Sequence, residues 1–127
     1  MSIFISCVYE DSHRITSIQK WKLKYMQGDV IITHETEDKR NLGKKEIKDH
    51  VSKKIRGAAV IFVLVGNNTH NHIWIESEVE LANSFHKKII CIRLPNTTGN
   101  IPIILKSFKC ISFDPHSITK ALADINQ

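Results

Sequence analysis

One glutamate stands at an apolar position of an otherwise amphipathic helix. Read at about 100° per residue, the segment from Trp74 to Phe85 has one broad apolar arc, and Glu78 falls near its middle. Glu76 and Glu80 fall on the opposite side, where charges belong on a surface helix. An ionised carboxylate on the apolar side loses hydration unless a partner pairs with it or a cleft keeps it wet. Glu78 is therefore the first candidate for a catalytic or binding carboxylate.

A run of polar residues precedes this helix. It consists of Asn67, Asn68, Thr69, His70, Asn71 and His72. One interpretation is a rim of hydrogen-bond donors and acceptors beside Glu78, suited to ribose hydroxyls or an amide. The other is turn chemistry with an N-cap for the helix, because Asn and Thr favour both positions. His70 and His72 alone do not make a zinc motif, and we expect no metal.

Three further side chains are candidates, each with a structural alternative. Ser6 ends the first apolar run and is either a core hydroxyl or a substrate contact. Asp11, with Glu10 before it, either caps the first helix or faces a ligand. Trp74 stands one turn before Glu78 on the same helix face, and is either a core residue or the wall of a pocket.

Short apolar runs alternate with helical patterns along the chain. Strands are predicted at residues 3–8, 30–33, 58–65, 88–94 and 108–113, and helices at 15–26, 47–55, 74–85 and 117–125. This order predicts an α/β fold: a five-stranded parallel sheet with helices on both faces, of the flavodoxin-like, doubly wound type.

The predicted sheet brings the candidate residues to one edge. In doubly wound domains, ligands bind outside the carboxyl ends of the strands, at the switch point in strand order. The loops at that edge are residues 9–12, 34–43, 67–73 and 95–102. Glu78 follows the third of these loops by about one helical turn. A cleft therefore suits it better than a sealed core.

Composition favours a single folded domain. The chain has 127 residues, of which 42% are hydrophobic, enough for one domain over 1–127 with a sizeable core. It contains no apolar run of membrane-spanning length and no secretory signal pattern, so we expect a cytoplasmic protein without a membrane partner. Cys7, Cys91 and Cys110 are odd in number and far apart, which predicts buried free thiols in a reducing compartment.

The formal net charge is +5, and much of the excess lies between Lys39 and Arg56. Such a stretch has three interpretations: a surface that binds nucleic acid, a surface that attracts a small polyanion such as a dinucleotide, or simply a solvated helix face. No aromatic residues interleave with it, which argues against single-strand nucleic acid binding. The glycine-rich dinucleotide fingerprint, the Walker loop and the Gly-x-Ser-x-Gly elbow are all absent. A receiver-like phosphoacceptor is disfavoured too, because the central strand ends at Gly66-Asn67 rather than at an aspartate.

Five sequence segments together resemble the TIR domain. They are Ile3-Phe4-Ile5-Ser6, Tyr9-Glu10-Asp11, Val60-Ile61-Phe62-Val63-Leu64-Val65-Gly66, Asn68-Thr69 and Trp74-x-x-x-Glu78. The similarity is greatest to the bacterial TIR-like proteins of the Thoeris anti-phage defence system, the ThsB type. It is densest over residues 47–94, and the order of elements agrees from end to end.

The resemblance implies cleavage of NAD⁺ at the nicotinamide–ribose bond, with NAD⁺ as substrate and no further cofactor. Glu78 matches the catalytic glutamate of enzymatic TIR domains. The expected substrate-binding set is Phe4, Ser6, Tyr9, Asp11, His34, Asn68 and Trp74. Residues 34–40 match the loop that gates the site and mediates assembly, which allows a homo-oligomer. The implied product is a cyclic or conjugated derivative of ADP-ribose that activates a separate effector after a phage-derived trigger.

A non-enzymatic scaffold is the alternative function. It would recruit partners through its loops and through the basic helix with Lys44, Lys48 and Lys53. This alternative predicts no NAD⁺ turnover under any trigger.

Overall fold

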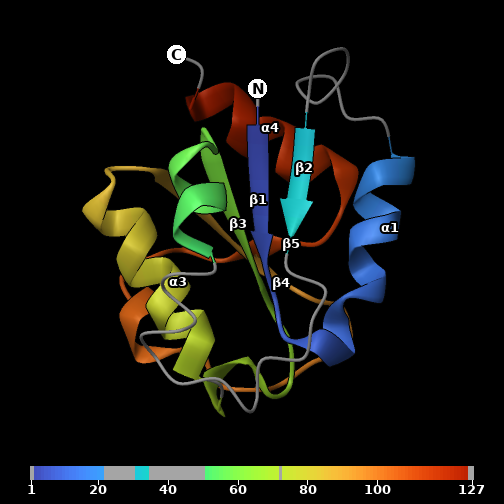
Figure 1. The fold of residues 1–127 in the computed structure, drawn as a ribbon. Helices are drawn as coiled ribbons and strands as arrows, with labels where there is room; N and C mark the ends of the chain where they lie inside the picture. Colours follow the sequence, from blue (N-terminus) through green and yellow to red (C-terminus); the bar gives the residue numbers. More distant parts are fainter. Residues whose placement is uncertain (1, 22–30, 35–50, 72, 126–127) are drawn as a thin grey trace.

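The chain folds around a parallel β-sheet, and Figure 1 shows its computed structural model. The structure describes residues 2–21, 31–34, 51–71 and 73–125. Its elements are β1 (Ser2–Ser6), the short 3₁₀ helix η1 (Tyr9–Asp11), α1 (His13–Lys20), β2 (Ile31–His34), β3 (Val60–Val65), η3 (Thr69–Asn71), α3 (Ile73–Ser84), β4 (Lys88–Arg93), η4 (Ile103–Leu105), β5 (Ile111–Ser112) and α4 (Pro115–Ile125). Residues 51–56 are also helical.

The sheet has five parallel strands in the order β2-β1-β3-β4-β5. The predicted doubly wound α/β fold is confirmed, although β5 contributes only Ile111 and Ser112. The chain leaves β1 toward β2 on one side and returns to β3 on the other. The switch point in strand order therefore lies between β1 and β3, where ligands of such folds bind.

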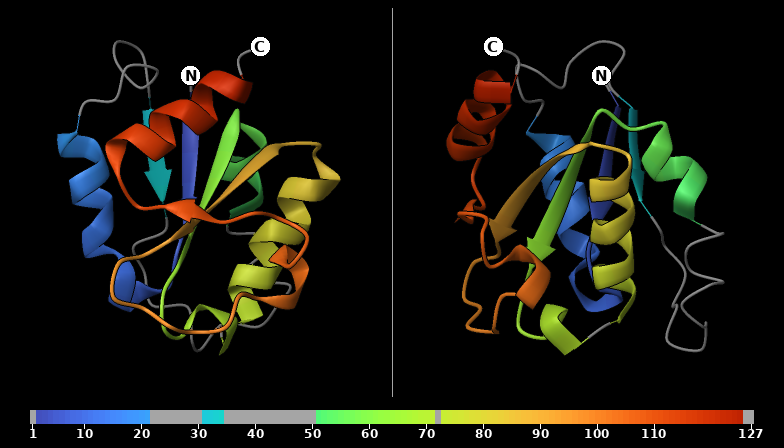
Figure 2. Two further views of the ribbon diagram at one scale, coloured as in Figure 1. Left: turned by 180° about the vertical axis from the view of Figure 1, so that it is seen from behind. Right: turned by 90° about the vertical axis from the view of Figure 1, so that its left-hand side faces the viewer.

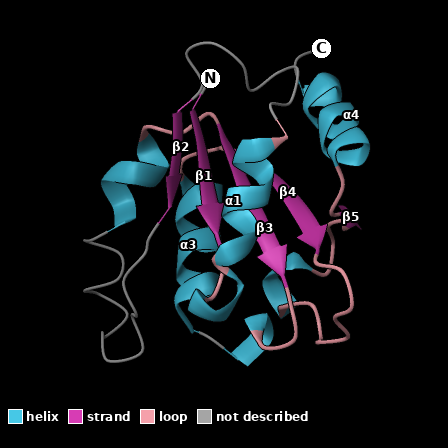
Figure 3. Cartoon of the chain, turned by 90° about the vertical axis from the view of Figure 1, so that its right-hand side faces the viewer, coloured by secondary structure: helices cyan, strands magenta, loops and turns pink. Residues whose placement is uncertain are grey.

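Alternation of side chains along the strands divides the core into two layers. On one face of the sheet, the strands pack against α1 and α4 through Ile3, Ile5, Ile15, Ile18, Val60, Phe62, Leu64, Ile90, Ile92, Leu94, Ile118 and Leu122. On the other face, they pack against α3 and the 51–56 helix through Phe4, Val51, Ile55, Ile61, Val63, Val65, Trp74, Ile75, Val79, Ala82 and Cys91. The views in Figure 2 and Figure 3 show these helices on the two sides of the sheet.

The central strand β3 is buried at all six positions, from Val60 to Val65. It pairs with β1 on one side and β4 on the other, so neither edge of β3 is open. A strand that is covered on both faces has a continuous apolar sequence, and the prediction of this strand rests on such a run. The predicted loop at 34–43 and the start of the helix at 47–55 fall almost wholly outside the described residues.

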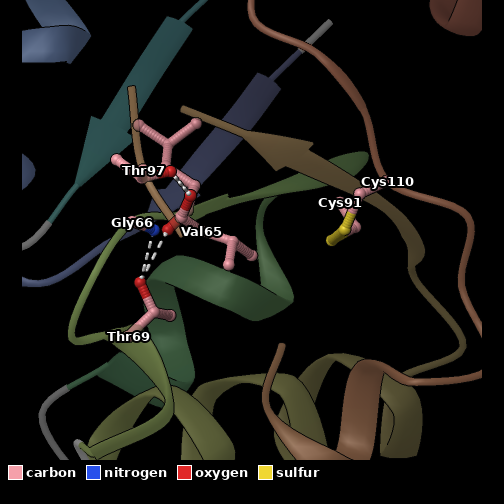
Figure 4. Close-up of a disulfide and its surroundings, with 7 residues drawn as sticks. Val65, Gly66, Thr69, Cys91, Thr97 and Cys110 are labelled. Atoms are coloured by element: carbon pink, nitrogen blue, oxygen red, sulfur yellow. Dashed lines mark hydrogen bonds between the residues drawn. A yellow bond between two sulfur atoms is a disulfide. The ribbon is translucent and has the colours of Figure 1, made fainter. Parts of the chain in front are cut away.

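Two of the three cysteines are joined. Cys91 on β4 forms a disulfide with Cys110, 19 residues later and just before β5 (Figure 4). The prediction of free thiols is therefore wrong for this pair. The two cysteines meet because of the sheet register. Ile92 on β4 pairs with Ile111 on β5, so the preceding residues, Cys91 and Cys110, lie opposite each other. Cys7 is outside the disulfide and is half-buried rather than buried.

None of the described helices is both long enough and apolar enough to span a bilayer.

Truncation of a core isoleucine tests this packing. Ile75 on α3 is fully buried, whereas Ile103 is 85% exposed. Ile75→Ala should lower the free energy of unfolding by about 2–5 kcal/mol, because it removes buried methyl groups and leaves a cavity. The matched change Ile103→Ala should alter it by no more than about 0.5 kcal/mol. Urea denaturation followed by circular dichroism measures both, and similar losses for the two variants would contradict this core.

Candidate functional site

Ser6 is placed by the alternation of β1. Phe4 points into the layer that contains α3, and Ser6, two residues later, lies on the same face of the strand. Ser6 ends β1 opposite Val63 of β3, and its exposed fraction is 1%. Alternation along β1 therefore places the Ser6 hydroxyl at the carboxyl end of the strand, on the face that packs against α3.

Glu78 accepts a hydrogen bond from that hydroxyl. It lies on the inner face of α3, and Ser6 Oγ donates a hydrogen bond to Glu78 Oε2. The exposed fraction of Glu78 is 1%, so the expectation of a cleft at this residue is wrong for this structure. The physical reason is the buried partner: a carboxylate bound by a hydroxyl can leave water at a much smaller cost than an isolated one.

The aromatic candidates near Glu78 belong to the core. Phe4 has no exposed surface and Trp74 is 5% exposed, and both pack in the cluster between the sheet and α3. Of the two interpretations of Trp74, the core residue agrees with the structure. Its position one turn before Glu78 means that the indole and the carboxylate share the inner face of the helix.

Asp11 is buried at the switch point. One of its carboxylate oxygens, Oδ2, has no hydrogen-bond partner among the described residues, and a Cβ on Gly66 would lie 2.4 Å from it. Gly66 is thus needed for Asp11 to approach the end of β3. Burial raises the pKa of Asp11, and the neighbouring charge of Glu10 raises it further. The capping interpretation is wrong, because the N-cap of α1 is Ser12 and no side chain bonds there.

A polar link joins the two sides of the switch point. Asn68 Nδ2 lies 3.1 and 3.2 Å from the two carboxylate oxygens of Glu10 and donates to them. This contact joins η1, after β1, to the loop after β3. Tyr9 in η1 is 62% exposed. The structure therefore gathers Ser6, Asp11 and Asn68 near the carboxyl ends of β1 and β3, while Tyr9 faces solvent.

The rim predicted from residues 67–72 is mostly turn chemistry. Thr69 Oγ1 accepts a hydrogen bond from Gly66 N at 2.8 Å, as Figure 4 shows. Asn67 Oδ1 accepts one from Thr98 N at 2.9 Å. These contacts shape the loop and hold its neighbours.

Part of the predicted set lies outside the described structure. His34 ends β2, opposite Ile5 of β1, but its side chain is not among those described. His72 and the loop at 35–40 are also outside, as are Lys44 and Lys48 of the basic stretch. Within the described residues, no group of three or more His, Cys, Asp or Glu side chains could hold a metal ion.

A cavity that the sequence pattern does not predict lies on the other side of α3. Its volume is about 850 Å³, and it is lined by residues 69–71, Glu76, residues 100–104 and Lys106. Glu76 is exposed on α3 and lines this cavity, whereas Glu78 points inward to Ser6. The one signal in the sequence is the apolar run at 101–105, which overlaps the end of the predicted loop at 95–102 and continues beyond it.

Comparisons with known proteins agree with this fold. The family model described as "Thoeris protein ThsB, TIR-like domain" matches residues 4–99. Among solved structures, the chain is similar to the TIR domain of the Toll-related receptor TRR-2 from Hydra magnipapillata, with a TM-score of 0.62 and 14% identity over 98% of both chains. At that identity the likeness concerns the fold alone. None of the curated proteins matches the chain.

The hydrogen bond between Ser6 and Glu78 should appear as a coupling energy between the two residues in the free energy of unfolding. Ser6→Ala removes the donor and should lower the free energy of unfolding by about 1–3 kcal/mol, since it weakens the solvation of a buried carboxylate. In a double-mutant cycle with Glu78→Gln, the coupling energy should be about 0.5–3 kcal/mol. Ser84→Ala on the exposed side of α3 is the matched control, with a change within about 0.5 kcal/mol. Additive effects of the two site variants would show that the bond contributes nothing.

Replacement of Asp11 should stabilise the protein in a pH-dependent way. Because the folded pKa of Asp11 is raised, the folded chain binds its proton more tightly than the unfolded chain does, and ionisation destabilises the fold. This penalty is present at neutral pH and disappears as the pH falls through the folded pKa toward the ordinary 3.8. Asp11→Asn should therefore raise Tm at pH 7, with a gain that shrinks toward pH 4. A lower Tm at pH 7, or a gain independent of pH, would contradict this.

Proposed function

The chain belongs to the TIR-like domain family of the Thoeris protein ThsB, part of an anti-phage defence system, and on that premise we propose that it cleaves NAD⁺ with Glu78. One observation carries the proposal. A carboxylate is retained inside the apolar face of α3, hydrogen-bonded to Ser6 at the carboxyl end of β1. Apolar packing alone would place a hydrophobic residue there.

The chemistry suits a single carboxylate. When the bond between ribose C1′ and the nicotinamide nitrogen breaks, the bonding electrons leave with nicotinamide, and the ribose takes on oxocarbenium character. A preorganised carboxylate in a poorly hydrated site stabilises that positive charge and holds ribose hydroxyls. Nicotinamide leaves as a neutral molecule, so the step requires no strong general acid.

The nucleophile that then meets C1′ sets the product. Water gives ADP-ribose, a group within the same nucleotide gives a cyclic isomer, and an amino acid gives a conjugate. We propose that the cyclic or conjugated product is the messenger that activates a separate effector. Ser6, Asp11 and Asn68 support the proposal by their place at the switch point between β1 and β3, where ligands of this fold class bind.

The burial of Glu78 adds a condition to the mechanism. With 1% of its surface exposed, the carboxylate does not contact a ribose in this arrangement. Catalysis therefore requires that the contact between Ser6 and Glu78 open, so that the carboxylate turns from β1 to the substrate. Such a requirement fits an enzyme that stays dormant until phage infection triggers it.

The same burial supports a second candidate, a non-enzymatic scaffold. A sealed carboxylate that never leaves Ser6 would serve only to fix α3 against β1. The two candidates differ in one respect: the scaffold releases no nicotinamide under any trigger.

Substitution of Glu78 tests the proposed chemistry. Glu78→Gln keeps the shape and removes the charge, so nicotinamide release from NAD⁺ in lysate of phage-infected cells should fall by about 10²-fold or more. Glu80→Gln on the same helix is the matched control and should keep the activity within about twofold. Full activity of Glu78→Gln would overturn the assignment. Absence of nicotinamide release by the unchanged protein during infection would favour the scaffold.

A further inference from the structure

The disulfide between Cys91 and Cys110 lies at the edge of the sheet with the shortest strand. β5 is the last strand in the order β2-β1-β3-β4-β5, and it is two residues long. Its ladder with β4 consists of two residue pairs, formed by Ile111 and Ser112, whereas each of the other strand pairings has at least four. So short a ladder contributes little stability by itself. The disulfide therefore adds a covalent attachment where the sheet has the fewest backbone contacts.

The same disulfide closes the segment between β4 and β5. This segment, residues 94–110, is called the β4–β5 connection. Near its start, Thr98 N donates a hydrogen bond to Asn67 Oδ1 at 2.9 Å. Gly99 lies so close to the loop after β3 that a Cβ at this position would clash with the backbone oxygens of Gly66 and Asn67. The β4–β5 connection is therefore packed against the end of β3, and the disulfide holds its other end (Figure 4).

The loop after β3 also joins the two sides of the switch point. Asn68 Nδ2 donates to both carboxylate oxygens of Glu10, which lies in η1 after β1. The preceding residue, Asn67, is the one that accepts the hydrogen bond from Thr98. A shift of the β4–β5 connection away from Gly66 and Asn67 would remove the support on one side of this loop. The disulfide is thus linked to the switch point through the β4–β5 connection and the loop after β3.

Both redox states of the cysteine pair are compatible with the core. Cys91 is 1% exposed and belongs to the core layer between the sheet and α3, and Cys110 packs against the same layer while half-buried. A free cysteine behaves as a small hydrophobic residue, so two thiols can remain in this layer after reduction. Cys110, as the more exposed of the two, is the one that a thiolate from solvent can attack. The bond can therefore open while the rest of the fold is kept.

From these features we propose that the bond between Cys91 and Cys110 is a reversible thiol–disulfide switch. In the oxidised form, the disulfide holds the β4–β5 connection against the loop after β3. In the reduced form, β5 keeps its two-residue ladder alone, and the β4–β5 connection and the loop after β3 open more often. The proposal does not depend on NAD⁺ cleavage, because neither cysteine is assigned a part in that chemistry.

A low-molecular-weight thiol such as glutathione is the reductant. Its thiolate attacks the sulfur of Cys110, the bond between the two protein sulfurs breaks, and Cys91 leaves as a thiolate that takes up a proton. The thiolate of a second glutathione then attacks the mixed disulfide at the glutathione sulfur, so that Cys110 is released and protonated. The protein gains two electrons and two protons, and two glutathione molecules become one glutathione disulfide.

Hydrogen–deuterium exchange of the full chain in glutathione buffers tests the proposal. Alkylation after denaturation counts the thiols, and we expect Cys7 alone in oxidised glutathione and all three cysteines in reduced glutathione. Reduction should speed amide exchange by about tenfold or more at residues 67–71, 96–101 and 106–112, while residues 61–64 of β3 exchange as before. Return to oxidised glutathione should restore the slow exchange.

A serine substitution separates the switch from other effects of the reductant. Cys110→Ser cannot form the bond, so its exchange should match that of the reduced protein in both buffers. Cys7→Ser is the matched control and should respond to glutathione as the unchanged protein does.

Four results would each overturn the proposal. One is a disulfide that does not form in oxidised glutathione or that resists reduced glutathione, and a second is equal exchange in the two redox states. A third is loss of protection throughout β3 on reduction, which would make the bond a requirement of the fold rather than a switch. The fourth is an exchange rate of Cys110→Ser that still changes with the buffer.

Discussion

The buried hydrogen bond from Ser6 to Glu78 is the interaction on which the rest of this site depends. It joins the end of a central strand to the inner face of the helix that packs over it. For the bond to form, β1 must present its alternate residues to α3, and α3 must sit in the rotation that turns Glu78 inward. Phe4 and Trp74 enforce both conditions from the same core layer. The carboxylate is tolerated in this core because the hydroxyl partly replaces the water that it loses.

Local patterns were sufficient to predict the sheet and to identify Glu78. Alternating apolar runs and helical periods define a parallel α/β fold, since no other common architecture uses that order of elements. Helical geometry alone also singled out Glu78 on the inner side of its helix. Whether that position is a cleft or a sealed contact depends on how β1 and α3 approach each other. This is a tertiary relation that spacing along one helix does not contain.

The remaining differences have the same origin. Cys91 and Cys110 are 19 residues apart, and only the pairing of β4 with β5 brings them together. The polar loop at 67–72 looked like a ligand rim, yet Asn67 and Thr69 bond to backbone groups of their own neighbourhood. The cavity beside Glu76 requires the long β4–β5 connection to fold back on η3. Helix α3 thus presents two carboxylates to two different environments, one in the core and one at an open cavity.

The central claim is that Glu78 leaves Ser6 to act on the ribose of NAD⁺. The most direct measurement is a crystal structure of the triggered protein with a non-cleavable NAD⁺ analogue. We expect the analogue to bind at the carboxyl ends of β1 and β3, with a Glu78 oxygen at hydrogen-bond distance from the nicotinamide ribose and Ser6 Oγ no longer bonded to Glu78. An analogue bound there while Glu78 stays buried against Ser6, or an analogue bound away from this edge of the sheet, would contradict the proposed mechanism.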